Sequence, residues 1–449
     1  MAKSKTQYIC QSCGASSPKW LGKCPQCNAW NSMEETVVAT PVKGKTAARS
    51  SSIPSEGIKL FKLKDVKPEK HKRISSKIGE LDRVLGGGMM PGSVILIGGE
   101  PGIGKSTLLL QVTIKNPEKK IIYVAGEESA AQIKDRADRL GSISESCHIS
   151  TELTVENLNE QLKKEKPNLI IVDSIQTLQS QNLESIPGTI SQIRESAYQL
   201  INMAKYLNVP LFLVGHITKS GNIAGPKVLE HMVDTVLQFE GEHTGQLRLL
   251  RTTKNRFGST AEIGVFEMQQ SGLREVSNPS ELLTRNDCEE LTGTAVAIIN
   301  EGIRPLMVEV QALVSPATYG TPQRTATGYD QKRLNMLLAV LEKKAGLKLS
   351  TRDVFVNIAG GLKIADTAID MAMAAAIISS YLDIVIKQHT CFTGEIGLSG
   401  EIRNVNQFEQ RLSEATRLGY KNIFARQKNA KEKNNVENIK RLIQLIGSQ

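Results

Sequence analysis

Short apolar runs alternate with longer amphipathic stretches through the middle of the chain. The runs have the length of buried strands, and they are Val94–Ile97, Ile121–Val124, Leu169–Val172 and Leu211–Val214. Helical patterns fill the stretches between them, at 129–140, 155–165 and 190–207. Strands that alternate with helices form a parallel sheet with helices packed against it. The pattern therefore predicts an α/β domain.

The pattern changes on both sides of this region. Residues 8–31 form a compact Cys-rich unit, and the polar stretch 34–58 is typical of a flexible linker. Beyond a polar boundary at 271–290, the chain predicts an α+β domain. Its expected elements are strands at Ala295–Ile299 and Leu306–Val310 and a buried helix at 366–382. The predicted parts are therefore a Cys-rich unit over 1–33, a flexible linker over 34–59, an α/β domain over 60–275 and an α+β domain over 276–449.

Composition fits a folded protein of two or three domains, because 40% of the 449 residues are hydrophobic and 23% are charged. The chain has no apolar run of about 18 residues and no apolar signal core at its start, so we expect a cytoplasmic protein. The formal charge of +10 lies at the ends, with +9 in residues 1–75 and +5 in 421–449. Basic ends suit a polyanion such as nucleic acid. They also suit solvated tails that keep the protein soluble.

Four of the seven cysteines lie in the first 27 residues, in two Cys-x2-Cys pairs. Two such pairs supply four thiolates, which close a tetrahedral structural zinc site. The expected ligands are Cys10, Cys13, Cys24 and Cys27. An iron–sulfur cluster also uses four thiolates, but paired knuckles favour zinc. Trp20 and Trp30 either pack on this site or stack on a base or partner, and packing is the favoured interpretation.

A phosphate-binding loop follows the run Val94–Ile97. The string G-x4-G-K-S lies between that strand and a helix predicted from Thr107, as the motif requires. Glycines let backbone N–H groups surround a phosphate at a helix N-terminus. Lys105 is expected on the β- and γ-phosphates of ATP, and the Ser106 hydroxyl on Mg²⁺. The predicted nucleotide-binding residues are Gly99, Glu100, Pro101, Gly102, Ile103, Gly104, Lys105, Ser106 and Thr107.

Carboxylates follow two other predicted strands. Asp173 comes directly after Leu169–Val172, where a second Mg²⁺-linked carboxylate is expected. Glu127 and Glu128 follow Ile121–Val124 in the string YVAGEES. A carboxylate on a strand beside the phosphate loop can polarise an attacking water. Glu127 is the favoured base, and Glu128 is the alternative, with a possible role at a helix start.

These motifs together resemble one family. The phosphate loop, the GEES turn and LIIVDS look like the core of a RecA-type ATPase. With the N-terminal cysteine pairs, the string Lys254-Asn-Arg256-Phe-Gly and the stretch 215–237, the chain resembles the bacterial RadA (Sms) family over nearly its whole length. The resemblance implies an α/β RecA-type P-loop ATPase with an N-terminal zinc ribbon-like module.

The resemblance also implies an activity and an assembly. It implies a DNA repair and recombination protein that forms a homo-hexameric ring on DNA and acts as an ATP-dependent helicase on branched intermediates. RecA recombinase or a replicative helicase is the implied protein partner. By match, Lys254 and Arg256 would reach a neighbour's nucleotide, and His216 would sense the γ-phosphate. Lys219 and Lys227, in a Gly-rich loop without aromatic residues, are expected to hold single-stranded DNA by its phosphates.

Residues 291–425 are similar to the peptidase domain of Lon proteases, chiefly at 393–420. Lon-type peptidases use a Ser nucleophile and a Lys base. The matching positions here are Ala368 and Glu409, and Thr367 is the adjacent hydroxyl should the match slip by one residue. Neither matching residue supplies that chemistry, which predicts a proteolytically inactive domain reused for assembly or DNA binding. Basic residues in it form either a DNA-facing patch or ordinary surface charge, namely Lys343, Lys344, Lys348 and Arg352.

The sequence thus predicts an ATP-dependent DNA motor that uses ATP, Mg²⁺ and Zn²⁺. Two alternatives remain open. One is a non-motor ATP switch that scaffolds a recombinase, because a motor and a switch share the same nucleotide pocket. The other is a Lon-like ATP-dependent protease, which the absent Ser–Lys pair disfavours.

Overall fold

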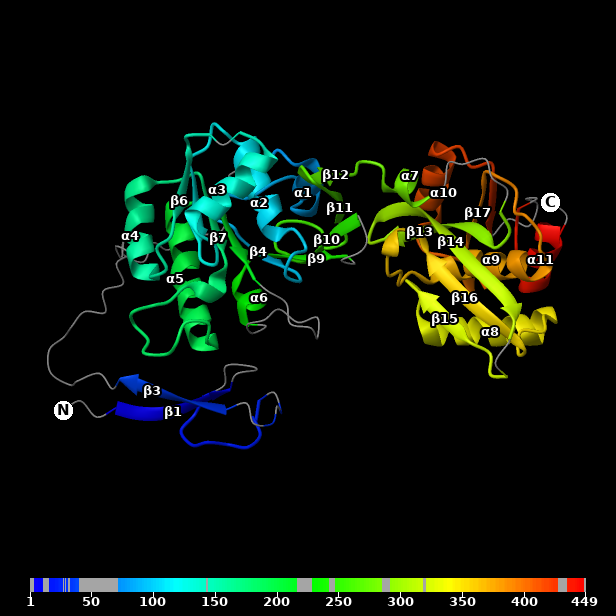
Figure 1. The fold of residues 1–449 in the computed structure, drawn as a ribbon, viewed down its shortest axis with the longest axis horizontal. Helices are drawn as coiled ribbons and strands as arrows, with labels where there is room; N and C mark the ends of the chain where they lie inside the picture. The colour runs from blue at the N-terminus through cyan, green and yellow to red at the C-terminus, as the bar shows by residue number, and fades with distance from the viewer. Residues whose placement is uncertain are drawn as a thin grey trace, which may run out of the picture. The chain divides into compact units, whose positions relative to one another are not determined.

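The computed structural model describes most of the chain. It describes residues 4–10, 16–26, 28, 30, 33–39, 72–142, 144–215, 228–241, 247–284, 291–317, 320–426 and 434–447. By its internal contacts the chain divides into two compact units. The first holds an N-terminal three-stranded sheet and a large mixed sheet, and the second holds a six-stranded sheet. Figure 1 gives the order of the elements along the chain.

The N-terminal module is a small antiparallel sheet of β1 (Ser4–Cys10), β2 (Ser16–Ser17) and β3 (Met33–Ala39). Strand β3 pairs with β1 along its whole length, from Ser4 opposite Ala39 to Cys10 opposite Met33. The linker predicted over 34–59 is therefore wrong for 34–39, because these residues use their backbone groups in a sheet. Residues 40–59 lie outside the described residues.

The large sheet has nine strands in the order β12-β11-β10-β9-β4-β8-β7-β5-β6. Six of these strands run parallel, namely β9, β4, β8, β7, β5 and β6. The alternation of strands and helices in the sequence predicted such a parallel sheet. The bounds are β4 Val94–Gly98, β5 Ile121–Ala125, β6 Cys147–Ser150, β7 Leu169–Asp173, β8 Leu211–Val214, β9 Thr235–Glu240, β10 Leu247–Asn255, β11 Ile263–Gln269 and β12 Gly272–Glu275.

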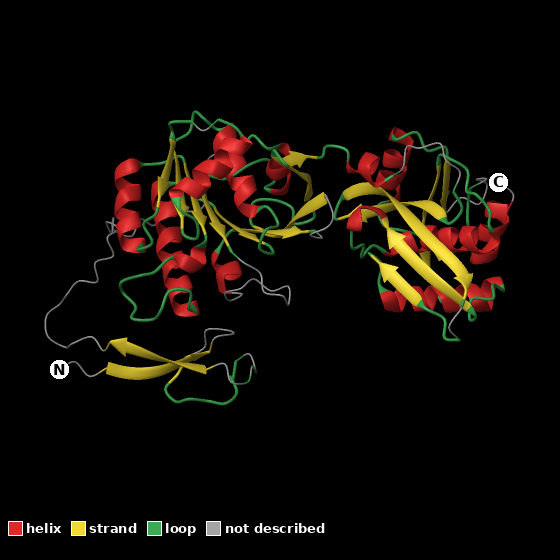
Figure 2. Ribbon diagram, in the orientation of Figure 1, coloured by secondary structure: helices red, strands yellow, loops and turns green. Residues whose placement is uncertain are grey.

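Helices cover both faces of this sheet (Figure 2). Strand β4 shows why, since Ile95 and Ile97 belong to one buried cluster and Val94 and Leu96 to another. Alternate side chains of a strand point to opposite faces, so an all-apolar strand needs cover on both. The helices are α1 Gly79–Val84, α2 Lys105–Lys115, α3 Ala130–Leu140, α4 Val155–Glu165, α5 Ile190–Leu207 and α6 Val228–Met232, with the 3₁₀ turn η2 Ile175–Thr177.

The second unit is α+β. Its sheet has the order β15-β16-β14-β13-β17-β20, and helix α9 packs against β13, β14 and β17. The predicted buried helix is confirmed in α9, whose first ten residues are all buried. The strands are β13 Thr294–Glu301, β14 Arg304–Pro316, β15 Arg324–Thr327, β16 Arg352–Ile358, β17 Thr390–Thr393, β18 Glu395–Ile396, β19 Ile402–Arg403 and β20 Asn422–Ala425. The helices are α7 Pro279–Leu283, α8 Gln331–Ala345, α9 Asp370–Leu382, α10 Phe408–Arg417 and α11 Ile439–Gly447, with the 3₁₀ turns η3 Ala359–Gly361 and η4 Thr367–Ile369. Among the described residues, no helix is both long and apolar enough to span a bilayer.

Candidate active site

The predicted phosphate loop joins β4 to α2. Gly102 and Gly104 have φ values of +77° and +119°, which side chains with a Cβ rarely adopt. A Cβ on Gly104 would lie 2.9 Å from the Met268 Cε, whereas one on Gly102 would meet no atom within 4 Å. The loop thus packs on the sheet at Gly104 and stays open at Gly102. This open, backbone-lined turn at a helix N-terminus fits a nucleotide phosphate.

Lys105 begins α2 and is almost fully buried, with 5% of its surface exposed. Its Nζ donates hydrogen bonds to the carbonyl oxygens of Gly99 at 2.8 Å and Glu100 at 2.9 Å. Burial lowers the pKa of Lys105, and the charges of Asp173 and Glu127 raise it. The ammonium therefore lies within electrostatic reach of both carboxylates. Ser106 and Thr107, the next two residues of α2, are half-buried.

Asp173 is the last residue of β7, between β5 and β8 in the sheet. Its Oδ2 accepts a hydrogen bond from the Tyr123 hydroxyl at 2.6 Å. Burial, and then the charge of Asp173, raise the pKa of Tyr123, so this phenol stays a donor at neutral pH. Tyr123 thereby fixes one oxygen of Asp173. The Asp173 carboxylate and the Ser106 hydroxyl are oxygen ligands of the kind that Mg²⁺ binds.

Glu127 and Glu128 differ in their partners. Glu127 is exposed, and its Oε1 accepts a hydrogen bond from the buried Ser174 hydroxyl at 2.6 Å. Glu128 instead forms an ion pair with Arg136 of α3. A carboxylate engaged by a guanidinium is a poorer acceptor for a water proton than one held by a neutral hydroxyl. That Glu127 is the base stays a prediction.

A close approach of two backbone segments places these groups. A Cβ on Gly126 would lie 1.8 Å from the Thr177 Oγ1, so only glycine lets η2 pack against the end of β5. Thr177 donates from Oγ1 to the Ser174 carbonyl at 2.8 Å, and Ser174 in turn holds Glu127. The sequence motifs did not single out Tyr123, Ser174 or Thr177. Tyr123 is the first residue of YVAGEES and Ser174 is the last residue of LIIVDS, which is the only signal that the sequence carries for them.

The predicted cross-subunit pair, Lys254 and Arg256, lies against α6 and the two residues that follow it. Lys254 donates from Nζ to the carbonyl oxygens of Glu230 at 2.7 Å and Val233 at 2.8 Å. Arg256 forms an ion pair of 3.2 Å with Asp234, and its side chain is 53% exposed. Burial lowers the pKa of Lys254, as does the charge of Arg256. Lys254 thus caps the carboxyl end of α6, where helix carbonyls attract a cation.

Three predicted residues lie outside the described residues, namely His216, Lys219 and Lys227. The structure gives their flanks. Strand β8 ends at Val214, and α6 begins at Val228. The predicted DNA-facing loop therefore leads into α6, and α6 is the helix whose carboxyl end Lys254 caps.

Two of the four predicted zinc ligands are described, Cys10 and Cys24. Both are fully buried, and they share one small cluster with Met33 and Tyr8. Asn28 has a φ of +59° and donates its N–H to the Cys24 carbonyl at 2.9 Å, which closes a tight turn after the second pair. Cys13 and Cys27 lie outside the described residues. Two buried thiols brought together from separate segments, in so small a core, fit a structural metal.

Trp20 and Trp30 do not pack into this cluster, so the favoured packing interpretation is wrong. Trp20 is 55% exposed and Trp30 is 73% exposed. The cluster is small because cysteines rather than large side chains form its centre. Among the described residues of the module, neither ring belongs to this cluster.

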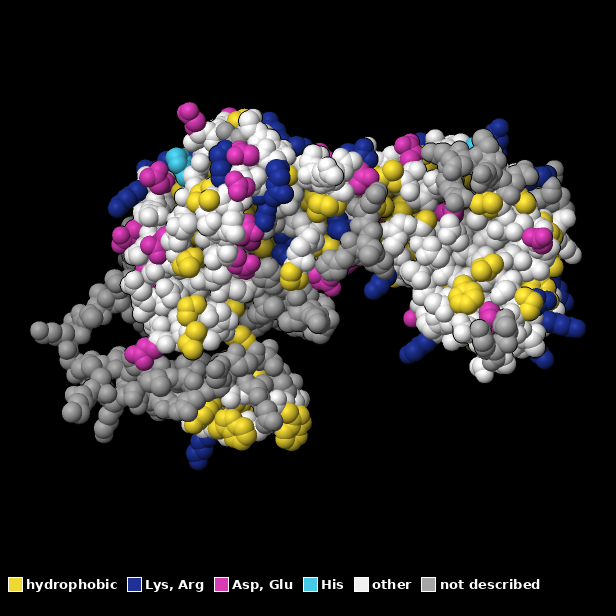
Figure 3. Space-filling view, in the orientation of Figure 1, with side chains coloured by type: hydrophobic (Ala, Val, Ile, Leu, Met, Phe, Trp, Pro, Cys, Tyr) yellow, Lys and Arg dark blue, Asp and Glu magenta, His cyan; other side chains and the backbone are white. Residues whose placement is uncertain are grey.

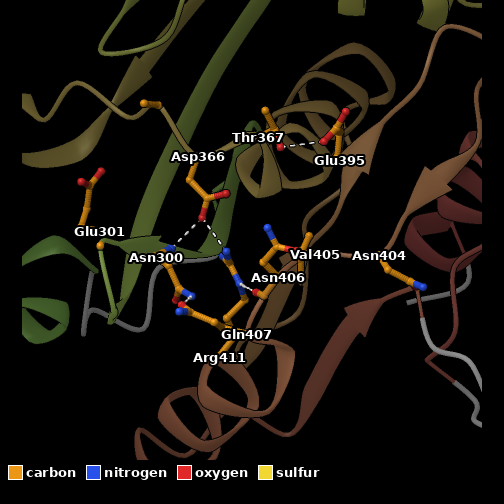
Figure 4. Close-up of a pocket in the computed structure, with 12 residues that line it drawn as sticks. Asn300, Glu301, Asp366, Thr367, Glu395, Asn404, Val405, Asn406, Gln407 and Arg411 are labelled. Carbon is orange, nitrogen blue, oxygen red and sulfur yellow. Dashed lines mark hydrogen bonds and ion pairs between the residues drawn. The ribbon is translucent and has the colours of Figure 1, made fainter. Parts of the chain in front are cut away.

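The second unit contains a polar cavity of about 540 Å³ beside the residues that match the peptidase site (Figure 4). Arg411 of α10 enters it with 2% of its surface exposed and binds Asp366 at 2.7 Å. Asp366 also accepts from the backbone N–H of Asn300 at 2.7 Å. Thr367 donates its hydroxyl to Glu395 at 2.8 Å. An ion pair and amide groups dominate this cavity.

The two positions that match the peptidase dyad do not face each other productively. Ala368 is fully buried, and Glu409 is exposed on α10. The α10 side chain that enters the cavity is Arg411, whose guanidinium offers only N–H donors and no base. Among the four candidate basic residues, three are exposed near the end of α8, and the Arg352 guanidinium lies 5.7 Å from the Tyr381 ring centre.

Three protein families match separate parts of the chain. The rubredoxin metal binding domain matches residues 8–35. KaiC, a family of ATPases, matches 74–147, which includes the phosphate loop and Glu127. Subunit ChlI of Mg-chelatase matches 317–429.

Curated relatives match nearly the whole chain. The DNA repair protein RadA of Bacillus subtilis is 46% identical over 426 residues, which cover 94% of this chain and 93% of the relative. RadA of Streptococcus pyogenes serotype M6 is 48% identical, with coverage of 95% and 93%. Among solved structures, a KaiC-like protein of Pyrococcus horikoshii is 21% identical and covers 46% of this chain and 99% of its own, with a TM-score of 0.38.

The expected fold class is confirmed. The chain combines a RecA- and KaiC-type P-loop ATPase fold with an N-terminal zinc ribbon-like module and a C-terminal α+β domain. The likeness of that last domain to Lon peptidases stays a prediction.

Proposed function

The chain belongs to the family of the DNA repair protein RadA, and from this premise we propose that it is an ATP-dependent DNA motor of homologous recombination and repair. Its substrate is single-stranded and branched DNA, and its partner is a RecA-type recombinase or a replicative helicase. The motor is a homo-hexameric ring. The zinc-binding module recognises DNA or a partner protein. The ATPase domain at 60–275 hydrolyses ATP, and the Lon-like domain at 276–449 serves assembly.

One observation supports ATP hydrolysis above all. Lys105 begins the helix after β4, Asp173 ends β7 and Glu127 follows β5, and the charges of both carboxylates act on the lysine ammonium. A cation and two carboxylates at a phosphate loop are the groups that phosphoryl transfer to water needs. Strand β8 separates β4 from β7, so the lysine and Asp173 approach from two strands that are not neighbours.

Each residue has a role in the proposed reaction. Lys105 leaves the loop carbonyls for the β- and γ-phosphates, and Ser106 and Asp173 hold the magnesium ion. That ion supplies charge neutralisation on the phosphates when it is bound. Glu127, oriented by Ser174, accepts the proton of the attacking water.

The remaining roles couple one subunit to the next. Arg256, more than half exposed, reaches a neighbour's nucleotide and stabilises charge in its transition state. Lys254 does so only when it leaves the carbonyls of α6, which frees the helix that follows the loop with Lys219 and Lys227. Nucleotide in the neighbouring subunit thereby changes how this loop contacts DNA. His216 couples the γ-phosphate to the same loop.

The test is strand displacement on forked DNA, with and without ATP, for wild type and Lys105→Ala. The assay is repeated with the recombinase on the single-stranded arm. Displacement that needs both ATP and Lys105 in either format supports the motor. ATP-dependent DNA binding without displacement in both formats refutes it and leaves the non-motor switch. Degradation of casein with ATP would instead support a protease. The exposed Glu409 and the lack of a nucleophile at Ala368 argue against that outcome.

A further inference from the structure

An exposed aromatic and basic surface lies on the N-terminal module, formed by Lys19, Trp20, Leu21, Lys23 and Trp30. Trp20, Leu21 and Trp30 are 55%, 38% and 73% exposed. Figure 3 shows hydrophobic side chains gathered on this module. Large aromatic rings left in water do not stabilise a fold, so their exposure calls for a ligand.

The rings are held by their surroundings. Trp30 pairs with Lys23 in an antiparallel bridge, and the Lys23 Nζ lies 5.7 Å from the centre of the Trp30 ring. Trp20 lies over Gly22, where an added Cβ would be 3.6 Å from the Trp20 Cη2. Flat rings fixed at one edge and open to solvent can stack on flat ligands with little loss of conformational freedom.

The charge around the rings selects the kind of ligand. Lys19 and Lys23 flank Trp20, and no Asp or Glu occurs before Glu34. Both lysines are exposed. A surface of aromatic faces and cations suits a polyanion with planar apolar groups, and single-stranded DNA is such a polymer. In duplex DNA the faces of the bases are already stacked and cannot meet these rings.

We propose that Trp20 and Trp30 stack on bases of single-stranded DNA, while Lys19 and Lys23 bind the adjoining phosphates. The inference rests on the proposed function for DNA as the class of ligand, and not on motor activity. The module then holds the strand through base faces without reading their edges, so binding is independent of sequence.

The chain offers a direct assay, because these are its only two tryptophans. Intrinsic tryptophan fluorescence of the full-length zinc-loaded protein therefore reports on this surface alone. The protein is titrated with oligothymidylate and, as the matched control, with an abasic oligodeoxynucleotide of equal length. Stacking predicts quenching by oligothymidylate and little quenching by the abasic strand. Trp20→Phe and Trp30→Phe each leave a single emitter, which shows whether both rings stack.

Variants measure the contribution of each group. Trp20→Ser and Trp30→Ser are each expected to weaken the binding of oligothymidylate roughly tenfold, and the Phe variants to retain it. Lys19→Gln and Lys23→Gln should each reduce the slope of log affinity against log salt by about 0.7. Zinc content and ATP turnover without DNA check that each variant folds. Cys13→Ser should lose both zinc and quenching and keep the ATPase domain folded.

Two results would overturn the proposal. One is an unchanged emission at oligonucleotide concentrations that saturate binding measured by anisotropy. The other is equal quenching by the abasic strand, which would mean that phosphates alone are bound. In the first case, a change in emission on adding a recombinase would assign the surface to a protein partner. If strand displacement fails while oligothymidylate still quenches the fluorescence, the motor proposal is refuted and the proposal that the two rings stack on bases is not.

Discussion

Replacing Gly126 with alanine tests how the fold positions the proposed base. The new Cβ would lie 1.8 Å from the Thr177 Oγ1, 2.8 Å from its Cβ and 3.2 Å from its Cγ2. Real Cβ contacts do not fall below 3.0 Å, so rotating the threonine side chain removes only part of the clash. The η2 turn must move away from β5.

That movement reaches Glu127 through two hydrogen bonds. Thr177 binds the Ser174 carbonyl at 2.8 Å, and the Ser174 hydroxyl binds Glu127 at 2.6 Å. Misplacing a reacting group by about 1 Å costs on the order of a hundredfold in rate. We expect Gly126→Ala to lower kcat for ATP hydrolysis by about that factor. Overpacking should also cost about 1–3 kcal/mol of stability.

The assay compares kcat, nucleotide affinity and thermal unfolding. Nucleotide affinity should change only a few-fold, because the loop from Gly99 to Thr107 does not include this position. Gly447→Ala is the matched control, since its added Cβ meets no atom within 4 Å. Adding Thr177→Ala should not restore kcat, because the Cβ of residue 177 stays 2.8 Å from the new Cβ and the hydrogen bond to the Ser174 carbonyl is lost. A folded Gly126→Ala protein with wild-type kcat would refute the idea that η2 positions the base.

Three further predictions concern other sites. Arg333→Leu should lower the free energy of unfolding by about 3–5 kcal/mol in urea titrations, because Asp370, 1% exposed, loses its ion pair; a loss under 1 kcal/mol would contradict this. Burial raises the pKa of Cys147 to about 11, so at pH 8 its alkylation by iodoacetamide should be about a hundredfold slower than that of an ordinary thiol and should rise with pH up to 11; a plateau near pH 9 would contradict this. The double variant Ala368→Ser with Glu409→Lys should not degrade casein with ATP, because position 409 faces solvent, and measurable degradation would show otherwise.

Periodicity predicted the elements where local pattern and packing agree. The helices 155–165 and 190–207 were predicted with the bounds that the structure has, because each presents a continuous apolar stripe to one core cluster. Strands β4, β5 and β7 were equally clear, since a strand buried on both faces is an unbroken apolar run. The phosphate loop was found for a related reason. Its glycines and lysine lie close together in the sequence, at 99–105, because they surround one phosphate.

Features that depend on distant approach were not predictable from local pattern. Strand β3 lies in a polar stretch, and only its pairing with β1 makes it a strand. The hydrogen bond from Tyr123 to Asp173 joins residues 50 apart in the sequence, and neither local motif indicates that the two residues are in contact. The exposure of Trp20 and Trp30 likewise depends on the packing of the module, which the residues next to them in the sequence do not reveal.

The C-terminal domain shows how a matching position differs from a matching site. The sequence match places Glu409 where a lysine base would stand, yet α10 turns Arg411 toward Asp366 and leaves Glu409 in solvent. A guanidinium buried to 98% needs its carboxylate, because an unpaired buried charge would cost several kcal/mol. Restoring single residues at matched positions therefore leaves this ion pair in the cavity. The predicted lack of peptide hydrolysis therefore rests on the ion pair of Arg411 with Asp366 as well as on Ala368 and Glu409.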